Sequence, residues 1–230
     1  MKILAFDTCF DGCSVCVAEQ RDTAVVALSS RMERFETGHA ERLIPMIGEV
    51  MEEARVAFGD LDRIAVTVGP GTFTGTRIGI AAARSFALAT SAPTVGVSSL
   101  AVMAEVARRT IDAETLAVVT DARRGEVYAQ LFDGRSGGNA DSEPLLLPID
   151  DAAQLGGRGA IMFVGSGAAA VAESAVRHGR EARAVLPDLL PDAVALAGIA
   201  AGLEASDTPL APFYLRPPDA KPQDKAIARV

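Results

Sequence analysis

The spacing of apolar residues predicts alternating strands and helices in the first half of the chain. Residues 3–7 are an apolar run that ends in an acid, and residues 13–19 and 23–29 follow as the two strands of a hairpin. A helix is predicted over residues 37–58, because apolar side chains recur there at helical spacing in Leu43, Ile47, Val50, Ala54 and Phe58.

Two more strands and two more helices complete this half. A strand over residues 63–68 leads into a glycine-rich turn and an alanine-rich helix that reaches residue 90. A strand over 94–97 and a helix over 100–109 follow. Strands that alternate with helices in this way predict an α/β layer with a mixed sheet.

The second half begins in the same way as the first. A strand over residues 116–121 again ends in an acid, a turn follows, and residues 126–132 form the next strand. The remaining elements are a polar loop (134–141), a strand (161–164), a helix that reaches residue 177 and a last helix (191–203). Because the order of elements recurs, we expect two related lobes around a cleft.

The expected boundaries follow from this division. Residues 1–110 form the N-terminal lobe and residues 111–215 the C-terminal lobe, with a last helix that is free to pack back on the first lobe. Residues 216–230 are rich in Pro and Lys and are expected to be a disordered tail.

Composition favours a soluble globular protein over a membrane or secreted one. Of the 230 residues, 49% are hydrophobic and 23% are charged. No run of about 18 apolar residues is present that could cross a bilayer. The N-terminus reaches Asp7 after only four apolar residues, which is too short for a signal peptide, so we expect a cytoplasmic protein without a membrane partner.

The formal net charge of −8 disfavours a chain that binds RNA by itself. Neutralising phosphates supplies most of the affinity for RNA, and a basic face is the usual means. If tRNA is a target, another subunit is expected to supply most of the binding charge. A local patch such as Arg123-Arg124 is compatible with this expectation.

Three cysteines, Cys9, Cys13 and Cys16, have the C-x3-C-x2-C spacing of radical enzymes that hold an iron–sulfur cluster. Residues 13–16 nevertheless lie in a predicted strand, where side chains 13 and 16 point to opposite faces and cannot share a cluster. We therefore interpret the cysteines as small buried thiols.

Two acids and a glycine-rich turn form the candidate chemical site. Asp7 and Asp121 stand at the carboxyl ends of predicted strands, where ligands bind in open α/β sheets, and two such acids could hold a magnesium ion through water. The turn at residues 69–79, GPGTFTGTRIG, offers backbone N–H groups to an anion but lacks the lysine of a Walker loop. The alternatives are acids that cap turns and a tight strand-to-helix turn that binds nothing.

His39 does not complete a metal site. A helical metal pair needs a second histidine at residue 43, which is a leucine, and the other histidine of the chain is His178. No Ser–His–Asp or Cys–His arrangement stands out in the sequence. We therefore expect no metal and no catalytic residue.

The first two helices carry more apolar surface than one core requires. The first has Ile44, Met46 and Met51 outside its main stripe, and the second is rich in Gly and Ala, which let another backbone approach. This surplus predicts either deeper burial within the monomer or a partner helix.

Five blocks of sequence form a recognisable set: Phe6-Asp7-Thr8, residues 39–45, residues 69–79, residues 121–128 and Tyr214-Leu215-Arg216. In this order and spacing they resemble the bacterial TsaB (YeaZ) family over almost the whole chain. The GPGTFTG-x-RIG block is the most specific of them.

The resemblance implies an actin-like, sugar-kinase-like (ASKHA) α/β fold of two lobes, with mixed sheets flanked by helices and a reduced second lobe. It implies a non-catalytic scaffold for threonylcarbamoyl transfer to the adenosine next to the anticodon of tRNA. The chain would act by binding TsaD, a larger paralogue that carries the metal and active site, and TsaE, an ATPase. It would contact tRNA only indirectly through this complex, form a homodimer when alone, and require no cofactor beyond weak nucleotide binding.

The resemblance also implies where two surfaces lie. The partner interface would lie on helices at about residues 39–57 and 75–90, at His39, Leu43, Met46, Ile47, Val50, Met51, Ala54, Gly75, Ile78, Gly79, Ala82, Ala83 and Phe86. A vestigial nucleotide cleft would comprise Asp7, Thr8, Gly69, Gly71, Thr72, Asp121 and Arg123.

Two other functions remain open. An ATP-using phosphotransferase or ATPase of the actin-like superfamily would place Asp7, Gly71 and Asp121 in its cleft. A simple homodimeric binding module would use the helices alone. Magnesium-dependent ATP turnover that Asp7→Ala abolishes would distinguish the enzyme from the scaffold.

Overall fold

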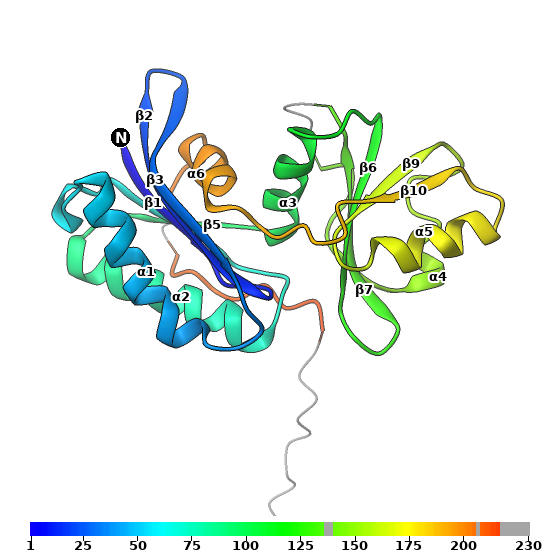
Figure 1. Cartoon of the computed structure of the whole chain (residues 1–230), viewed down its shortest axis with the longest axis horizontal. Helices are drawn as coiled ribbons and strands as arrows, with labels where there is room; N and C mark the ends of the chain where they lie inside the picture. Colours follow the sequence, from blue (N-terminus) through cyan, green and yellow to red (C-terminus); the bar gives the residue numbers. More distant parts are fainter. Residues whose placement is uncertain (136–139, 206–207, 217–230) are drawn as a thin grey trace, which may run out of the picture.

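Two five-stranded sheets with their helices form two lobes that lie side by side (Figure 1). The computed structural model describes residues 1–135, 140–205 and 208–216. Part of the predicted loop at 134–141, and the predicted tail from residue 217 onward, lie outside the described residues.

The first sheet combines a meander with two parallel strands. Its order is β3 (Ala24–Arg34), β2 (Gly12–Arg21), β1 (Lys2–Asp7), β4 (Arg63–Thr67) and β5 (Thr94–Val97). β1, β2 and β3 pair antiparallel, whereas β4 and β5 run parallel to β1. Alternation along β1 sends Leu4 and Phe6 to one face and Ile3 and Ala5 to the other.

The second sheet repeats this arrangement. Its order is β8 (Leu145–Pro148), β7 (Glu126–Asp133), β6 (Thr115–Asp121), β9 (Ile161–Val164) and β10 (Ala182–Val185). β6, β7 and β8 pair antiparallel, whereas β9 and β10 run parallel to β6. The recurring order of elements along the chain therefore reflects two sheets of one topology.

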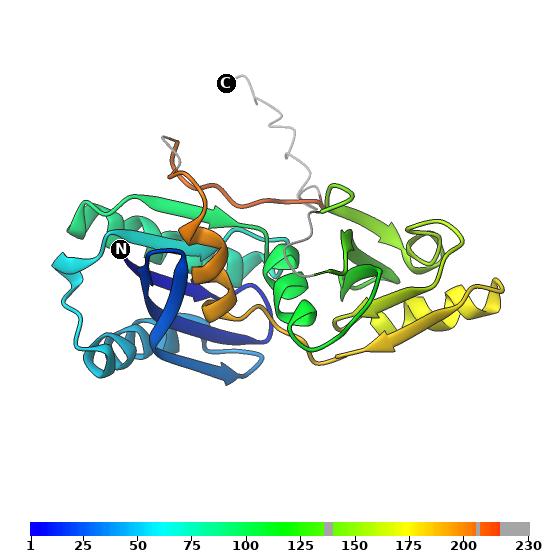
Figure 2. The ribbon, with the colours of Figure 1, turned by 90° about the horizontal axis from the view of Figure 1, so that it is seen from above.

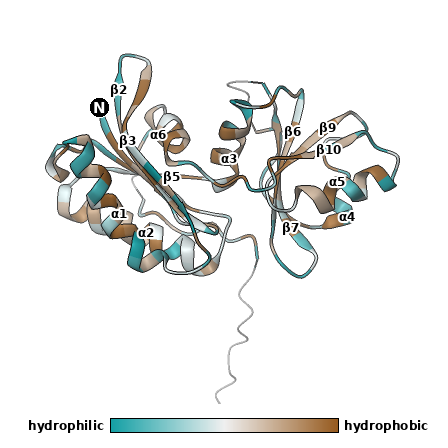
Figure 3. Cartoon of the chain, viewed as in Figure 1, coloured by the Kyte–Doolittle hydropathy of each residue, from teal (hydrophilic) through white to brown (hydrophobic). Residues whose placement is uncertain are grey.

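Two long helices, α1 (His39–Ala54) and α2 (Phe73–Thr90), cover the outer face of the first sheet. Their buried side chains, among them Leu43, Ile47 and Ile80, share one core with Leu4 and Phe6 of β1. Figure 3 shows the consequence for α1, in which hydrophilic and hydrophobic residues alternate around the helix.

The third helix of each lobe packs on the sheet of the other lobe. α3 (Ser99–Arg108) follows β5 but packs on β6 and β7, where Leu100 and Met103 join Leu116. α6 (Ala193–Ala201) follows β10 but packs on β1, β2, β4 and β5, where Leu196 joins Ala5. Because α3 and α6 also contact each other, this exchange fastens the lobes together.

The second lobe carries less helix than the first. α4 (Ile149–Ala152) has four residues and α5 (Ala168–Arg177) has ten, against sixteen in α1 and eighteen in α2. The predicted two-lobed α/β class with mixed sheets and a reduced second lobe is thus confirmed. Among the described residues, no helix has both the length and the hydropathy to cross a bilayer.

Several elements differ from prediction. α1 ends at Ala54 because Arg55 adopts a left-handed conformation (φ 53°), and a separate 3-10 turn, η1 (Phe58–Asp60), follows. β3 continues beyond residue 29 to Arg34 on an exposed edge. β8 and β10 were not predicted, since each is a four-residue edge strand whose pairing partner is distant in sequence.

Candidate functional site

Asp7, the acid at the end of β1, is buried. Its carboxylate accepts hydrogen bonds from the Thr67 hydroxyl and from the Cys9 backbone N–H (3.2 Å). Burial raises the pKa of Asp7 to about 6, and these hydrogen bonds oppose the shift only in part. With only 3% of its surface exposed, Asp7 cannot contact a metal ion or phosphate unless the segments that cover it move.

The glycine-rich turn packs closely against the chain that leaves β1. A Cβ at Gly71 would lie 2.5 Å from the Cys9 carbonyl oxygen, and one at Gly75 would overlap the Thr8 carbonyl oxygen. The Thr72 N–H donates to the Cys9 oxygen (2.7 Å), and the Thr8 hydroxyl donates to the Gly75 carbonyl (2.7 Å). These contacts favour the tight-turn interpretation over an anion-binding loop.

A small hollow lies between the lobes, next to the end of β6. Its volume is about 210 Å³, which is below the roughly 300–1,000 Å³ of typical ligand pockets. Thr72, Asp121 and Arg123 line it together with Thr120 and Ser166. The other predicted cleft residues are not among its lining residues: Asp7, Thr8, Gly69 and Gly71.

Asp121 caps a turn at the rim of this hollow. Its carboxylate accepts a hydrogen bond from the Arg123 N–H (2.8 Å), and its own N–H donates to the Ser166 hydroxyl (3.0 Å). Arg123 and Arg124 follow with positive φ angles of 65° and 60°. Since Asp121 is exposed and Asp7 is buried, the two acids do not form a pair that faces one cleft.

His39 is held by protein contacts at the start of α1. Its Nε2 lies 2.7 Å from the Phe10 carbonyl oxygen, and its ring packs edge-on against Phe35. Leu43, one turn further along, is sealed in the core. Within the described parts of the chain, no group of three His, Cys, Asp or Glu side chains is arranged to hold a metal ion.

The three cysteines are buried free thiols. Cys13 belongs to the core beneath α1 and α2, whereas Cys16 belongs to the core beneath α6, on the other face of β2. Burial raises the pKa of both thiols to about 12, which leaves them protonated at neutral pH.

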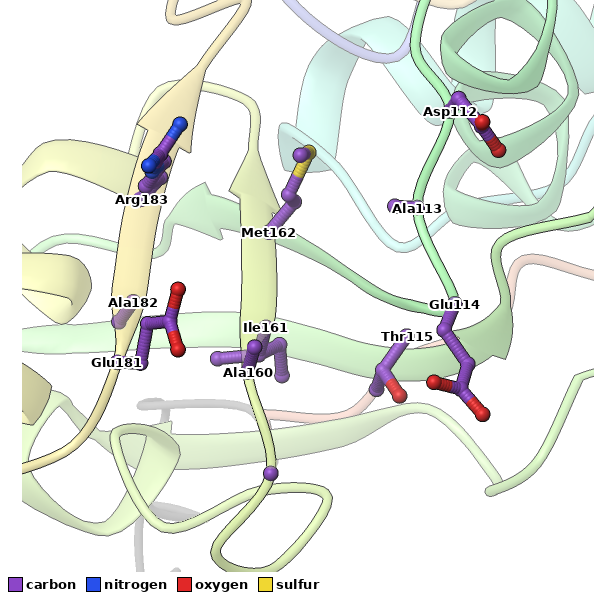
Figure 4. Close-up of a pocket in the computed structure, with 11 residues that line it drawn as sticks. Asp112, Ala113, Glu114, Thr115, Ala160, Ile161, Met162, Glu181, Ala182 and Arg183 are labelled. Atoms are coloured by element: carbon purple, nitrogen blue, oxygen red, sulfur yellow. The ribbon is translucent and has the colours of Figure 1, made fainter.

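A groove of about 530 Å³ lies where β6, β9 and β10 begin (Figure 4). Asp112, Glu114, Glu181 and Arg183 stand around it with apolar side chains between them. Sequence reasoning did not indicate this groove. Ligands of parallel sheets bind at the carboxyl ends of strands, and this groove lies at the amino ends.

Comparisons with known proteins give the chain's relationships. The family model of TsaD, tRNA N6-adenosine threonylcarbamoyltransferase, matches residues 33–141. An uncharacterized protein of Mycobacterium tuberculosis is 36% identical over 96% of this chain and 94% of its own length. YeaZ from Pseudomonas aeruginosa is 31% identical, covers 93% of this chain and 99% of its own, and superimposes with a TM-score of 0.75.

The chain belongs to the TsaB (YeaZ) family. A named TsaB, the tRNA threonylcarbamoyladenosine biosynthesis protein of Escherichia coli, is 38% identical over 128 residues. That match covers 56% of this chain and 53% of the relative. The predicted family is thereby confirmed.

Most of the interface residues predicted from the TsaB resemblance are in the monomer core. α1 packs on β2, β3 and α2 at once, so its two apolar stripes merge into one broad buried face. Nine of the predicted residues are buried within the monomer: His39, Leu43, Met46, Ile47, Val50, Met51, Gly75, Gly79 and Ala83. Four are half-buried: Ala54, Ile78, Ala82 and Phe86.

Other residues of the same two helices remain exposed. Ile44 is 52% exposed on α1, and Leu88 is 88% exposed on α2. The surplus apolar set of α1 included Ile44, but Met46 and Met51 of that set are buried. The signal that separates them is position around the helix, since Ile44 lies beside the exposed Pro45 and Gly48.

Proposed function

We propose that this TsaB-family chain is an accessory subunit for the synthesis of threonylcarbamoyladenosine on tRNA and performs no chemistry itself. It acts by binding a TsaD-like paralogue and a TsaE-like ATPase, and it forms a homodimer when alone. Its place of action is the cytoplasm, where tRNA is modified. The name of the Escherichia coli relative supports a role in this process, and the family model supports kinship with TsaD.

One observation carries the proposal that the chain works through a partner. Large apolar side chains remain exposed on two neighbouring helices, Ile44 on α1 and Leu88 on α2. Small exposed residues accompany them, Gly48 on α1 and Ala81 on α2, and let another helix approach closely. Burying one such large side chain in an interface contributes about 1.5–3 kcal/mol.

Introducing a negative charge at these positions tests the proposal. The tagged chain is co-expressed with its TsaD-like paralogue, purified and analysed by size-exclusion chromatography with light scattering. We expect Ile44→Glu and Leu88→Glu to weaken assembly tenfold or more, because a carboxylate would have to be buried. Threonylcarbamoyladenosine in digested tRNA, measured by mass spectrometry, should fall in parallel.

A matched control comes from the second lobe. Val176 of α5 is 56% exposed, so Val176→Glu adds the same charge away from α1 and α2. We expect this variant to assemble like the parent. Ile47→Glu would be uninformative, since Ile47 is fully buried and the variant would unfold. Full assembly by both Ile44→Glu and Leu88→Glu would exclude this surface as the partner interface.

The rival proposal, an ATP-using phosphotransferase or ATPase, has less support. Its acid, Asp7, would be buried beneath the turn, and the hollow beside Asp121 is small for a nucleoside triphosphate. Magnesium-dependent ATP turnover by the purified chain, lost in Asp7→Ala, would revive it.

A further inference from the structure

Three side chains at the start of α2 form an exposed cluster of aromatic rings around a cation. The Arg77 guanidinium lies 3.5 Å from the centroid of the Phe73 ring. Its Nε donates a hydrogen bond to the Tyr214 hydroxyl (2.6 Å), and the Phe73 and Tyr214 rings stack with centroids 5.9 Å apart. Phe73 is 58% exposed and Tyr214 is 45% exposed. We call these three residues the Arg77 cluster.

The Arg77 cluster is held in place by the segment that follows α6. This segment returns along the first lobe and reaches the second lobe, as the orange-to-red trace in Figure 2 shows. Leu210 is buried against the first lobe, and the Phe213 N–H donates to the Val68 carbonyl (2.7 Å). Arg216 then pairs with Glu126 of β7 (2.6 Å). Tyr214 is therefore anchored on both sides, and the cluster is preorganised.

α2 carries positive charge only, although the chain is acidic overall. α2 contains no Asp or Glu, and it carries Arg77 and Arg84. Neither arginine forms an ion pair with another described residue: Arg77 donates to Tyr214, and Arg84 donates to the Leu210 carbonyl. Seven residues separate them, which is about 10.5 Å along the helix axis. The helix N-terminus adds to the positive potential.

We infer that the Arg77 cluster, with Arg84, binds single-stranded RNA. Bases stack on exposed Tyr and Phe rings and on Arg guanidinium planes, and phosphates bind arginines whose charge is not neutralised. An acidic protein segment would match the arginines but would gain little from the stacked rings. The inference rests on the proposed function in one respect, the identity of the RNA, which we take to be a loop of a substrate tRNA.

This surface adds a direct contact to the indirect one expected from the net charge of −8. Two phosphate contacts and one or two stacked bases give weak binding by themselves. Within a complex whose other subunit holds the tRNA, the same contacts would position one part of the RNA.

Photo-crosslinking and affinity measurements test the inference with the full-length chain. A fluorescently labelled anticodon stem-loop RNA is titrated at several salt concentrations, alone and with the TsaD-like paralogue present. Ultraviolet crosslinks are then mapped by mass spectrometry. We expect crosslinked peptides that contain Phe73 or Tyr214.

Two substitutions remove different parts of the contact. Tyr214→Ala removes a stacking ring and should weaken RNA binding roughly fivefold or more. Tyr214→Phe keeps the ring and should bind nearly like the parent, which separates stacking from any effect on folding. Arg77→Gln should weaken binding and reduce the slope of log affinity against log salt by about 0.7.

A matched control is Arg183→Gln, which removes an exposed arginine of β10 in the second lobe and should leave binding unchanged. Parental RNA affinity in both Tyr214→Ala and Arg77→Gln, with crosslinks elsewhere, would overturn the inference. Loss of paralogue binding in these variants without any change in RNA binding would assign the cluster to a protein partner and overturn it equally. Because the measurement on the isolated chain does not require the TsaD-like paralogue, its failure can be distinguished from failure of the Ile44 and Leu88 test.

Discussion

At the residue scale, Asp7 shows how burial changes what an acid can do. The residue stands at a strand end, where an exposed carboxylate would bind a metal or phosphate. Here it accepts hydrogen bonds from Thr67 and Cys9 beneath the glycine-rich turn. Its pKa of about 6 in the folded chain means that burial disfavours the charged carboxylate relative to the neutral acid. The acid therefore costs stability at neutral pH.

The pH dependence of unfolding measures this cost. The pKa of Asp7 rises from 3.8 to about 6 on folding, so the native state binds more protons than the unfolded state between these values. Stability should fall as pH rises through this window and be constant above it. Asp7→Asn lacks the ionisation. Its stability relative to the parent should increase by about 3 kcal/mol between pH 3.5 and 7.5.

Urea denaturation at both pH values would measure the difference. Asp121→Asn is the control for the substitution itself, because Asp121 is an exposed acid at the end of β6, the strand that corresponds to β1 in the second lobe. A difference between Asp7→Asn and parent that does not vary with pH would show that Asp7 ionises normally in the folded chain.

Sequence reasoning located Asp7 but could not decide its exposure. The residue type and strand-end position are visible in the sequence, whereas the Thr67 hydroxyl comes from another strand and the covering turn from further along the chain. The glycine-rich turn was predicted either to offer N–H groups to an anion or to be a tight strand-to-helix turn. Whether a ligand or the chain itself packs against the turn depends on distant residues. Thr8 contacts Gly75, 67 residues later in the chain, and Cys9 contacts Gly71, 62 residues later.

At the element scale, α1 shows why helical periodicity predicted the helix but not its surface. A single sheet contact would leave a narrow apolar stripe buried. α1 instead meets β2, β3 and α2, and so Met46 and Met51 are buried together with Leu43 and Ile47. Ion pairs from Arg42 to Glu33 of β3 and to Glu49 of α1 reinforce this placement at the polar edge.

Adjacent alanine substitutions distinguish the two sides of α1. Leu43→Ala should lower the free energy of unfolding by about 2–5 kcal/mol, because it leaves a cavity in the core. Ile44→Ala should change it by no more than about 0.5 kcal/mol, since Ile44 is 52% exposed. Urea denaturation followed by far-ultraviolet circular dichroism gives both values. Equal losses for the two variants would mean that Ile44 is also covered within the monomer.

At the scale of the whole molecule, the exchange of third helices couples the lobes. Most strands of each sheet are predicted from their own half of the chain, because sequential strands pair through local hairpins and crossovers, and β8 and β10 are the exceptions. The sequence does not indicate where α3 packs. For α6 it left open a return to the first lobe, since this helix is apolar on all sides and could cover either sheet. Its side chains pack beneath β1, β2, β4 and β5, and it touches α3, which covers the second sheet.

This coupling predicts that a destabilising substitution in one lobe also lowers the stability of the other lobe. Leu196 of α6 is fully buried in the core of the first lobe, so Leu196→Ala should destabilise the chain by about 2–5 kcal/mol. If the lobes unfold as one unit, the most protected amides of β6 and β7 should exchange faster by the same factor as those of β1 and β4. Hydrogen exchange with mass spectrometry resolves these strands. Val176→Ala on the exposed side of α5 should change neither group. Faster exchange confined to β1 and β4 would mean that the lobes unfold independently despite the exchanged helices.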